Sequence, residues 1–201
     1  MLEDLITLRE PPTNRVCFCE GGVEQHLSEG AVMVAFAPHL LRTVPGLKHV
    51  AVHPDGEHGI QFDFQGWLKK RGFSLKDPMG KTSYGGTYSS AGGQTILINP
   101  TSGHGDVVAP IGEITFVAEC KGGIINTKHP GQQSRLRRGL CEAIGLSLAS
   151  PRSKGRRQFA VVPLTKVTES LAQRMASRAA DAGIEIALVD RHGNVANVAP
   201  K

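Results

Sequence analysis

The sequence predicts an α/β protein with a central mixed β-sheet flanked by helices on both faces. Strand-length apolar runs alternate with amphipathic helical segments through much of the 201-residue chain, an order typical of layered α/β domains. A chain of this length forms one sizeable domain, or one domain with a small appended unit. A second observation is a pair of adjacent apolar strands, at about residues 105–121, that carries ionisable side chains.

The bulk composition is that of a globular protein, with 40% apolar and 20% charged residues. No apolar run approaches the ~20 residues that span a bilayer, and the segment 1–5 lacks the basic start of a signal peptide. We therefore expect a cytoplasmic protein without membrane association. Four cysteines are too few and too unevenly placed for a disulfide framework: Cys17, Cys19, Cys120 and Cys141. Cys17 and Cys19 with His26 form only a partial metal motif, so buried thiols are the simpler interpretation.

The first 54 residues are expected to form an N-terminal extension or small subdomain, with dimerisation or a lid as its alternative roles. A helix is predicted at about residues 28–42, capped by Ser28, and Pro38 predicts a late kink or an early stop. A short strand is predicted at 48–53. The main domain is expected to comprise residues 55–201.

A second helix is predicted over residues 57–73, because Phe64, Trp67 and Leu68 have helical spacing and Gly72 can end it. Residues 74–105 are rich in Gly, Ser and Thr, with one strand at 94–99. Such a stretch indicates either a substrate-binding loop or a mobile surface excursion.

The strand pair at 105–121 holds the candidate site. Asp, Glu and Lys are costly in apolar strands unless they are paired or bind metal. Glu119 and Lys121 point to the same face because side chains alternate. If the hairpin closes on residues 111–112, Asp106 lies opposite Val117 and diagonal to Glu119, roughly 7–8 Å away. Two carboxylates at that separation can share a divalent cation beside a lysine, which is the outline of a hydrolytic site.

The remaining elements are a helix at 132–148, a strand at 158–163, a helix at about 168–182 capped by Thr168, a strand at 184–189, and a tail of turn and coil from 190. The segment from Lys121 to Arg157 contains nine basic residues and one acidic residue, Glu142. This imbalance is typical of a surface that binds a polyanion, although a solvated basic helix and loop is the alternative.

With these elements placed, the chain resembles the PD-(D/E)xK nuclease superfamily, which has the restriction-endonuclease-like fold. The residues that carry the resemblance are Asp106 in Gly-Asp-Val-Val-Ala and, thirteen residues later, Glu119-Cys120-Lys121 at the end of an apolar strand. The order of elements agrees over about residues 57–190. The helix closing on Gly72-Phe73 is similar to the first helix of archaeal Holliday-junction resolvases.

The resemblance implies a Mg²⁺-dependent endonuclease that acts on nucleic acid, with DNA favoured over RNA and Mn²⁺ able to substitute. Asp106, Glu119 and the backbone carbonyl of Cys120 would hold the metal, while Lys121 would position water or neutralise charge. A glutamine at the start of the next helix, Gln133 or Gln132, would order the water or the phosphate. Restriction-like enzymes often dimerise, so a homodimer is also expected.

One position departs from the family pattern. The first helix of the family usually supplies a glutamate about three turns before its closing glycine, and Gln61 stands there. Glu57 and Asp63 are weaker substitutes for that glutamate, and His104 is a further candidate near Asp106. Basic side chains are expected to grip the phosphate backbone: Lys128, Arg135, Arg138, Arg152, Lys154, Arg156 and Arg157.

Two alternatives to the nuclease remain open from the residues. A nucleic-acid-binding or regulatory protein could keep the fold with reduced or no catalysis, which Gln61 makes credible. Glu119 and Lys121 could instead form an exposed ion pair on an edge strand. Phe116 and Val117 argue against the edge strand, because apolar residues on both faces indicate a central strand.

Overall fold

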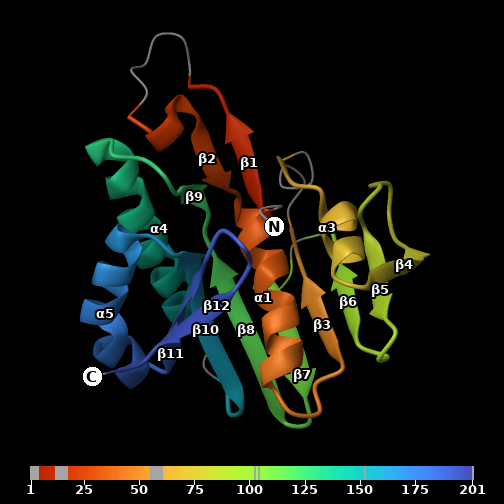
Figure 1. Ribbon diagram of the computed structural model, residues 1–201. Coiled ribbons are helices and arrows are strands. Elements are labelled where there is room, and N and C mark those ends of the chain that lie inside the picture. Colours follow the sequence, from red (N-terminus) through yellow and green to blue (C-terminus); the bar gives the residue numbers. More distant parts are fainter. Residues whose placement is uncertain are drawn as a thin grey trace.

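The computed structural model describes residues 5–11, 18–54, 61–101, 103, 105–151 and 153–200. Within these residues, nine strands form one mixed sheet in the order β12-β11-β10-β8-β7-β3-β6-β5-β4 (Figure 1). Their bounds are β3 His49–Val52, β4 Phe73–Pro78, β5 Gly86–Ser90, β6 Thr95–Ile98, β7 Val107–Ile111, β8 Ile114–Cys120, β10 Arg156–Pro163, β11 Ile184–Val189 and β12 Val195–Val198. The predicted α/β class with a mixed central sheet is confirmed.

Helices cover both faces of the sheet, because alternate side chains of the central strands enter two separate cores. Phe159 and Val161 of β10 lie in the core of helix α1 (Glu29–Thr43). Ala160 and Val162 lie in a second core with helices α4 (Pro130–Ala149) and α5 (Lys166–Asp181). Apolar residues on both faces explain the nearly continuous apolar runs of β10 and β11.

Helix α1 begins where the sequence predicts, because the Ser28 side chain accepts a hydrogen bond from the Ala31 N–H at 3.2 Å. Pro38 neither stops the helix nor shortens it, and α1 continues to Thr43. The helix is buried along most of its length, and β3 pairs with β6 and β7 within the central sheet. The described residues among the first 54 therefore share a sheet and a core with the described residues that follow them.

A smaller sheet lies above one edge of the central sheet (Figure 1). It consists of β1 (Ile6–Arg9), β2 (Glu24–Leu27) and β9 (Gly123–Ile124), all antiparallel, preceded by a 3-10 turn at Glu20–Gly22. Strand β9 follows Lys121 directly, so this sheet stands beside the end of β8. We call it the small sheet below.

The helix predicted over 57–73 is shorter in the structure. Helix α3 runs over Phe64–Lys70, and the Asp63 side chain caps it by accepting from the Gly66 N–H at 2.9 Å. Gly72 has a φ of 81° and ends the segment as expected. Glu57 lies outside the described residues.

Residues 74–105 are not a long loop, because β4, β5 and β6 extend the central sheet by three strands. Buried Tyr88 anchors this extension, and its hydroxyl donates to the Tyr84 carbonyl at 2.8 Å. The high Gly, Ser and Thr content reflects tight turns between short strands. The prediction of a substrate loop for this whole stretch is wrong.

Two corrections concern the C-terminal part. Thr165, not Thr168, caps α5: Thr165 Oγ1 accepts from the Thr168 N–H at 3.1 Å, and Thr168 Oγ1 accepts from the Thr165 N–H at 2.9 Å. This reciprocal pair is a capping box in which threonine replaces the usual Glu or Gln. The tail from residue 190 is not all coil, because β12 pairs with β11.

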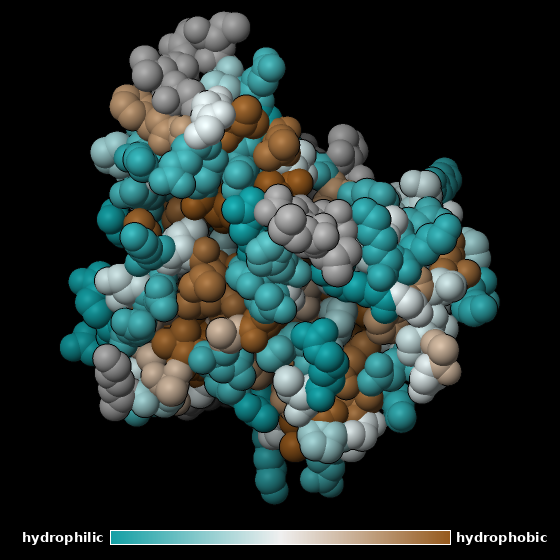
Figure 2. Space-filling model, viewed as in Figure 1, coloured by the Kyte–Doolittle hydropathy of each residue, from teal (hydrophilic) through white to brown (hydrophobic). Residues whose placement is uncertain are grey.

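None of the helices in the described part of the chain has the length and apolar composition to cross a bilayer. Hydrophilic residues cover much of the visible face of the molecule, and hydrophobic residues are seen in the recesses between them (Figure 2).

Candidate active site

The hairpin β7–β8 brings two carboxylates close together. Its two-residue turn is Gly112-Glu113, with Ile111 paired to Ile114, because Gly112 takes a φ of 55° that glycine adopts without strain. The register therefore differs by two residues from the one expected. Val108, not Asp106, is therefore opposite Val117, and the Asp106 N–H donates to the Ala118 carbonyl at 2.9 Å, next to Glu119.

Asp106 is held by the strand it faces. Its Oδ2 accepts a hydrogen bond from the Cys120 N–H at 2.7 Å. Burial raises the pKa of Asp106 to about 7; the Cys120 N–H and Lys121 lower it, and the charges of Glu119 and Glu29 raise it further. A carboxyl that titrates near neutral pH beside two other carboxylates is typical of a functional site.

Glu119 and Lys121 share the face of β8 that α4 covers. Phe116 and Ala118 belong to the α1 core, and alternation sends Glu119 and Lys121 to the opposite face. Burial raises the pKa of Glu119, while the charge of Lys121 opposes this shift. A Cβ placed on Gly139 of α4 would lie 3.3 Å from Lys121 Cβ, so the helix passes directly over the lysine.

Glu29, which the sequence analysis did not assign to the site, completes the cluster. Lys121 Nζ lies 3.1 Å from Glu29 Oε1 and 3.5 Å from Glu142 Oε1. Burial is the largest influence on the lysine and lowers its pKa, but Glu29, Asp106 and Glu142 together raise the pKa above its usual value. Lys121 is therefore a protonated ammonium group among carboxylates.

Gly122 allows the loop after Lys121 to approach the start of α1. A Cβ at this position would lie 2.5 Å from both the Glu29 nitrogen and the Leu27 carbonyl oxygen, and 2.7 Å from the Ser28 carbonyl carbon. All three are backbone atoms that cannot swing aside. The glycine thus fixes how closely Glu29 stands to Lys121.

Gln61 lies near this cluster, although not in the way expected. It precedes α3 and lines a cavity of about 220 Å³ together with Glu29, His26 and Arg9. Its backbone carbonyl accepts from Thr7 Oγ1 at 3.2 Å, which ties it to β1 of the small sheet. His104 lies outside the described residues.

The two glutamines at the start of α4 differ in their surroundings. Gln133 Nε2 donates to the Thr127 carbonyl at 3.4 Å. Gln132 lies seven residues before Gly139, two turns earlier on the same side of the helix, so it faces the Lys121 side. Gln132 is thus better placed toward the cluster than Gln133.

The basic residues of the sequence divide between two edges of the sheet. Arg135 and Arg138 are exposed on the first half of α4, and Lys128 precedes that helix and pairs with Glu20 at 3.5 Å. Arg156 and Arg157 begin β10, where β8 also begins, about six residues or ~20 Å from Lys121. Arg157 Nε donates to Glu185 at 2.9 Å. Lys154 precedes them in the same loop, and Arg152 lies outside the described residues.

The cluster offers oxygen ligands for a hard cation. Glu29, Asp106 and Glu119 supply carboxylates, and the Cys120 carbonyl lies on the Asp106 side of β8, since the N–H and C=O of one strand residue point the same way. In the described part of the chain, however, no three His, Cys, Asp or Glu side chains stand ready as ligands of one ion. Metal binding would compete with the Lys121 ion pair and the Cys120 hydrogen bond.

The cysteines contribute little to this chemistry. Cys120 and Cys141 are free thiols, Cys19 is partly exposed, and Cys17 lies outside the described residues. Burial raises the pKa of the Cys120 thiol well above its usual value, so the side chain is a neutral core group and only its backbone faces the site.

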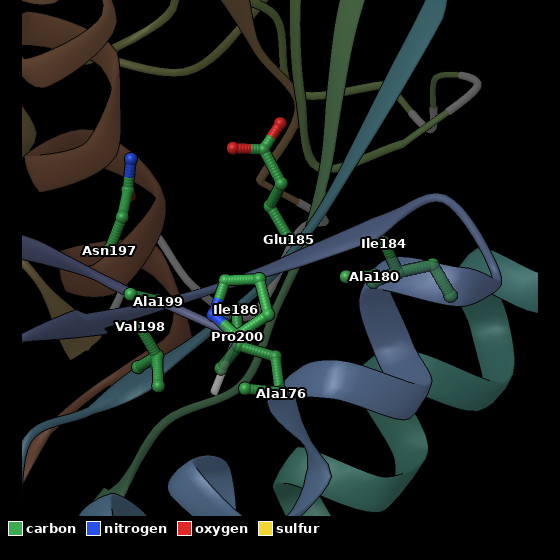
Figure 3. Close-up of a pocket in the computed structure, with 9 residues that line it drawn as sticks. All are labelled: Ala176, Ala180, Ile184, Glu185, Ile186, Asn197, Val198, Ala199 and Pro200. Carbon is green, nitrogen blue, oxygen red and sulfur yellow. The ribbon is translucent and has the colours of Figure 1, made fainter.

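A larger apolar cavity of about 370 Å³ lies away from the cluster (Figure 3). It is formed between α5 and the β11–β12 edge, and Ile184 places it where β11 begins, at the opposite edge of the sheet from Lys121. Glu185 and Asn197 point away from Ala176 and Ala180 in this view. The cavity presents no titratable cluster, so the carboxylates remain the candidate active site.

Comparison of the chain with protein-family models, with curated proteins and with solved structures found no match.

Proposed function

We propose that the protein is a metal-dependent nuclease that hydrolyses phosphodiester bonds in nucleic acid, with DNA as the expected substrate. The convergence of Glu29, Asp106 and Glu119 around Lys121 carries this proposal. Burial and neighbouring negative charge raise the pKa values of Asp106 and Glu119, and a divalent cation would offset this repulsion. The resemblance to PD-(D/E)xK nucleases agrees, because that family has a glutamate on its first helix, and Glu29 is a glutamate on α1.

The donor types suit Mg²⁺, since carboxylates and a backbone carbonyl are the ligands that it prefers, and the described side chains would have to draw together to share one ion. Glu29, Asp106, Glu119 and the Cys120 carbonyl would hold it. A bound Mg²⁺ would acidify a water molecule and stabilise negative charge on the phosphate. Mn²⁺ is expected to substitute.

Lys121 would act as a cation and hydrogen-bond donor. Because its pKa is raised, it is protonated at neutral pH and cannot serve as a general base. Its ammonium group would neutralise charge that develops on phosphate oxygens. Gln132, on the same side of α4, would hydrogen-bond the attacking water or a phosphate oxygen.

The exposed Arg135 and Arg138 would contact the phosphate backbone beside the cleavage site. Arg157, which begins β10 at the opposite edge and pairs with Glu185, is not needed for this role, whereas the charge of Arg156 acts on Glu119 and lowers its pKa. A homodimer that cuts both strands stays a prediction from the resemblance.

A second candidate is a nucleic-acid-binding protein that keeps the same arrangement without catalysis. The observation that favours it is that the cluster is already satisfied: Lys121 pairs with Glu29, and Asp106 bonds the Cys120 N–H. A protein that needs these groups only for folding would show the same contacts.

A plasmid-nicking assay with Mg²⁺ or Mn²⁺ separates the two. We expect nicking by the wild type and a loss of about 10²–10³-fold in Asp106→Ala and Lys121→Ala, typical of removing one charge-stabilising group. Glu113→Gln, an exposed acid in the hairpin turn, is the control and should cut normally. Equal cutting by wild type and both site variants would end the nuclease assignment. DNA binding without any cutting would favour the second candidate.

A further inference from the structure

A polar cavity of about 430 Å³ lies beside the proposed site, between the small sheet and the β11–β12 turn. Its volume is in the range of small-ligand sites. Its lining comes from the segments that follow β9, β10 and β11, and from β2 and the turn before β2. The lining residues are Glu20, Gln25, Ile125, Asn126, Leu164, Asp190, Arg191 and His192.

The cavity is close to Lys121. Cys120 is paired with Val161, so Lys121 stands next to Val162, and Leu164 lies two residues farther along β10. With strands ~4.8 Å apart and ~3.3 Å per residue, the Cα atoms of Lys121 and Leu164 are about 8 Å apart. A nucleotide next to a phosphate held at Lys121 could reach the cavity.

The wall from the small sheet is fixed by Asn126. Its Oδ1 accepts from the Gln25 N–H at 2.9 Å, and its Nδ2 donates to the Glu20 and Val23 carbonyls at 3.1 and 2.8 Å. The Ile125 N–H also donates to the Gln25 carbonyl at 2.9 Å. The N–H and the carbonyl of Gln25 are thus both bonded to the segment after β9, and this residue lines the cavity.

The opposite wall is equally ordered. Asp190 accepts three hydrogen bonds at 2.8 Å, from the His192 N–H, the Asn194 N–H and Asn194 Nδ2. The His192 carbonyl accepts from Arg71 at 3.1 Å, which fastens the turn to the end of α3. Because both walls are held by hydrogen bonds, the cavity is pre-formed, and little conformational entropy is lost when a ligand binds.

The lining suits a nucleobase better than a phosphate. Ile125 and the 38%-exposed Leu164 offer apolar surface for one face of a planar ring. The Gln25 amide can both donate to and accept from a base edge. Glu20 and Asp190 border the cavity together with Arg191 and His192, so its lining is of mixed charge and is not a purely cationic phosphate site.

We propose that this cavity receives the base of an unpaired nucleotide next to the scissile phosphate. The natural substrate then contains at least one unpaired nucleotide, as in a bulge, a flap, a branch or a single strand. The inference rests on the proposed nuclease function for the position of the phosphate. Binding of the base depends on the cavity alone and is measured separately.

The test compares binding of two DNA hairpins in EDTA, one fully paired and one with a single bulged 2-aminopurine. We expect the wild type to bind the bulged hairpin roughly tenfold more tightly, the effect of stacking one base. Leu164→Glu should bring the ratio of the two affinities close to one. Ile114→Glu, which adds the same charge to an exposed apolar residue at the far end of β8, should keep the ratio.

Gln25→Leu, which removes the amide without adding charge, should lower the ratio by a smaller factor and make it less dependent on the identity of the bulged base. Equal wild-type affinity for both hairpins would overturn the inference, as would a ratio that Leu164→Glu leaves unchanged. The nuclease proposal fails separately, if the wild type cuts neither hairpin with Mg²⁺ or Mn²⁺ while the binding ratio holds.

Discussion

Lys121 Nζ lies 3.1 Å from Glu29 Oε1, although 92 residues separate the two along the chain. This ion pair joins the first turn of α1 to the end of β8, where Asp106 and Glu119 also lie. Both side chains are about one-fifth exposed, so the pair is screened less than a surface salt bridge. The relationship makes α1 part of the candidate active site.

Glu29 is therefore expected to contribute to metal affinity. Glu29→Gln keeps the size of the side chain and removes one anionic ligand, and Lys121 retains Glu142 as a partner. We expect Mn²⁺ affinity, measured by titration calorimetry, and DNA cleavage to fall at least ~10-fold. The matched control is Glu113→Gln at the opposite edge, which should change neither. A Glu29→Gln variant with wild-type Mn²⁺ affinity would exclude Glu29 as a ligand.

The raised pKa of Asp106 predicts a pH dependence of stability in the metal-free protein. The folded protein holds this proton up to a pKa of about 7, whereas an exposed aspartate releases it near 3.8. The folded state thus binds more protons than the unfolded state between about pH 4 and 7, and the free energy of unfolding falls as pH rises through that window. Urea unfolding at pH 5 and pH 8 should show this loss.

Asp106→Asn removes the titrating group and should flatten most of that dependence, while Glu119, also raised, supplies the remainder. For the same reason, Mn²⁺ binding should release protons and strengthen as pH rises from 5 to 8. If the free energy of unfolding depended on pH in the same way in the wild type and in Asp106→Asn, the proton would not belong to Asp106.

Gly122→Ala tests the close approach of the β8 loop to α1. The added Cβ would meet three backbone atoms at 2.5 to 2.7 Å, so we expect a destabilisation of about 1–3 kcal/mol and weaker cleavage. Gly145→Ala in α4 is the matched control, because a Cβ there meets nothing within 4 Å. That control should be neutral or stabilising by up to ~1 kcal/mol, since alanine favours a helix. Thermal unfolding of both variants measures the difference, and equal effects would refute the close approach.

The two groups of basic residues should differ in their effect on DNA binding. Arg135→Ala and Arg138→Ala should each weaken binding and reduce the slope of log K against log salt by about one. Arg157→Ala, at the other edge and paired with Glu185, should leave that slope unchanged. A salt titration followed by fluorescence anisotropy measures all three. A slope that depends on Arg157 and not on Arg135 would place the DNA at the edge of the sheet opposite the candidate active site and contradict the proposal.

The sequence was sufficient for the elements with strong local signals. Ser28 marks the start of α1, Gly72 ends the α3 segment, and the apolar runs of β8, β10 and β11 predict strands, with β8 in a central position. Asp106, Glu119 and Lys121 do meet at the end of one hairpin. Their faces were predictable because a strand alternates regardless of its partners.

The remaining features depend on long-range contacts that no local pattern records. The hairpin turns at residues 112–113 rather than 111–112, so Val108 instead of Asp106 lies opposite Val117. Glu29 begins a helix that was expected, but its contact with Lys121 spans 92 residues. The basic block was continuous in sequence, yet α4 carries its two halves to opposite edges of the sheet.

The central claim is most directly tested by Mg²⁺-dependent cleavage of a labelled DNA substrate by the wild type and the Asp106→Asn/Glu119→Gln double variant, purified through the same steps. Circular dichroism should first show that both are folded. The wild type is predicted to cut with Mg²⁺ and to stop when EDTA is added, and the double variant is predicted not to cut. Cleavage of equal rate in both preparations, or a wild type that cuts no substrate with either Mg²⁺ or Mn²⁺, would contradict the account.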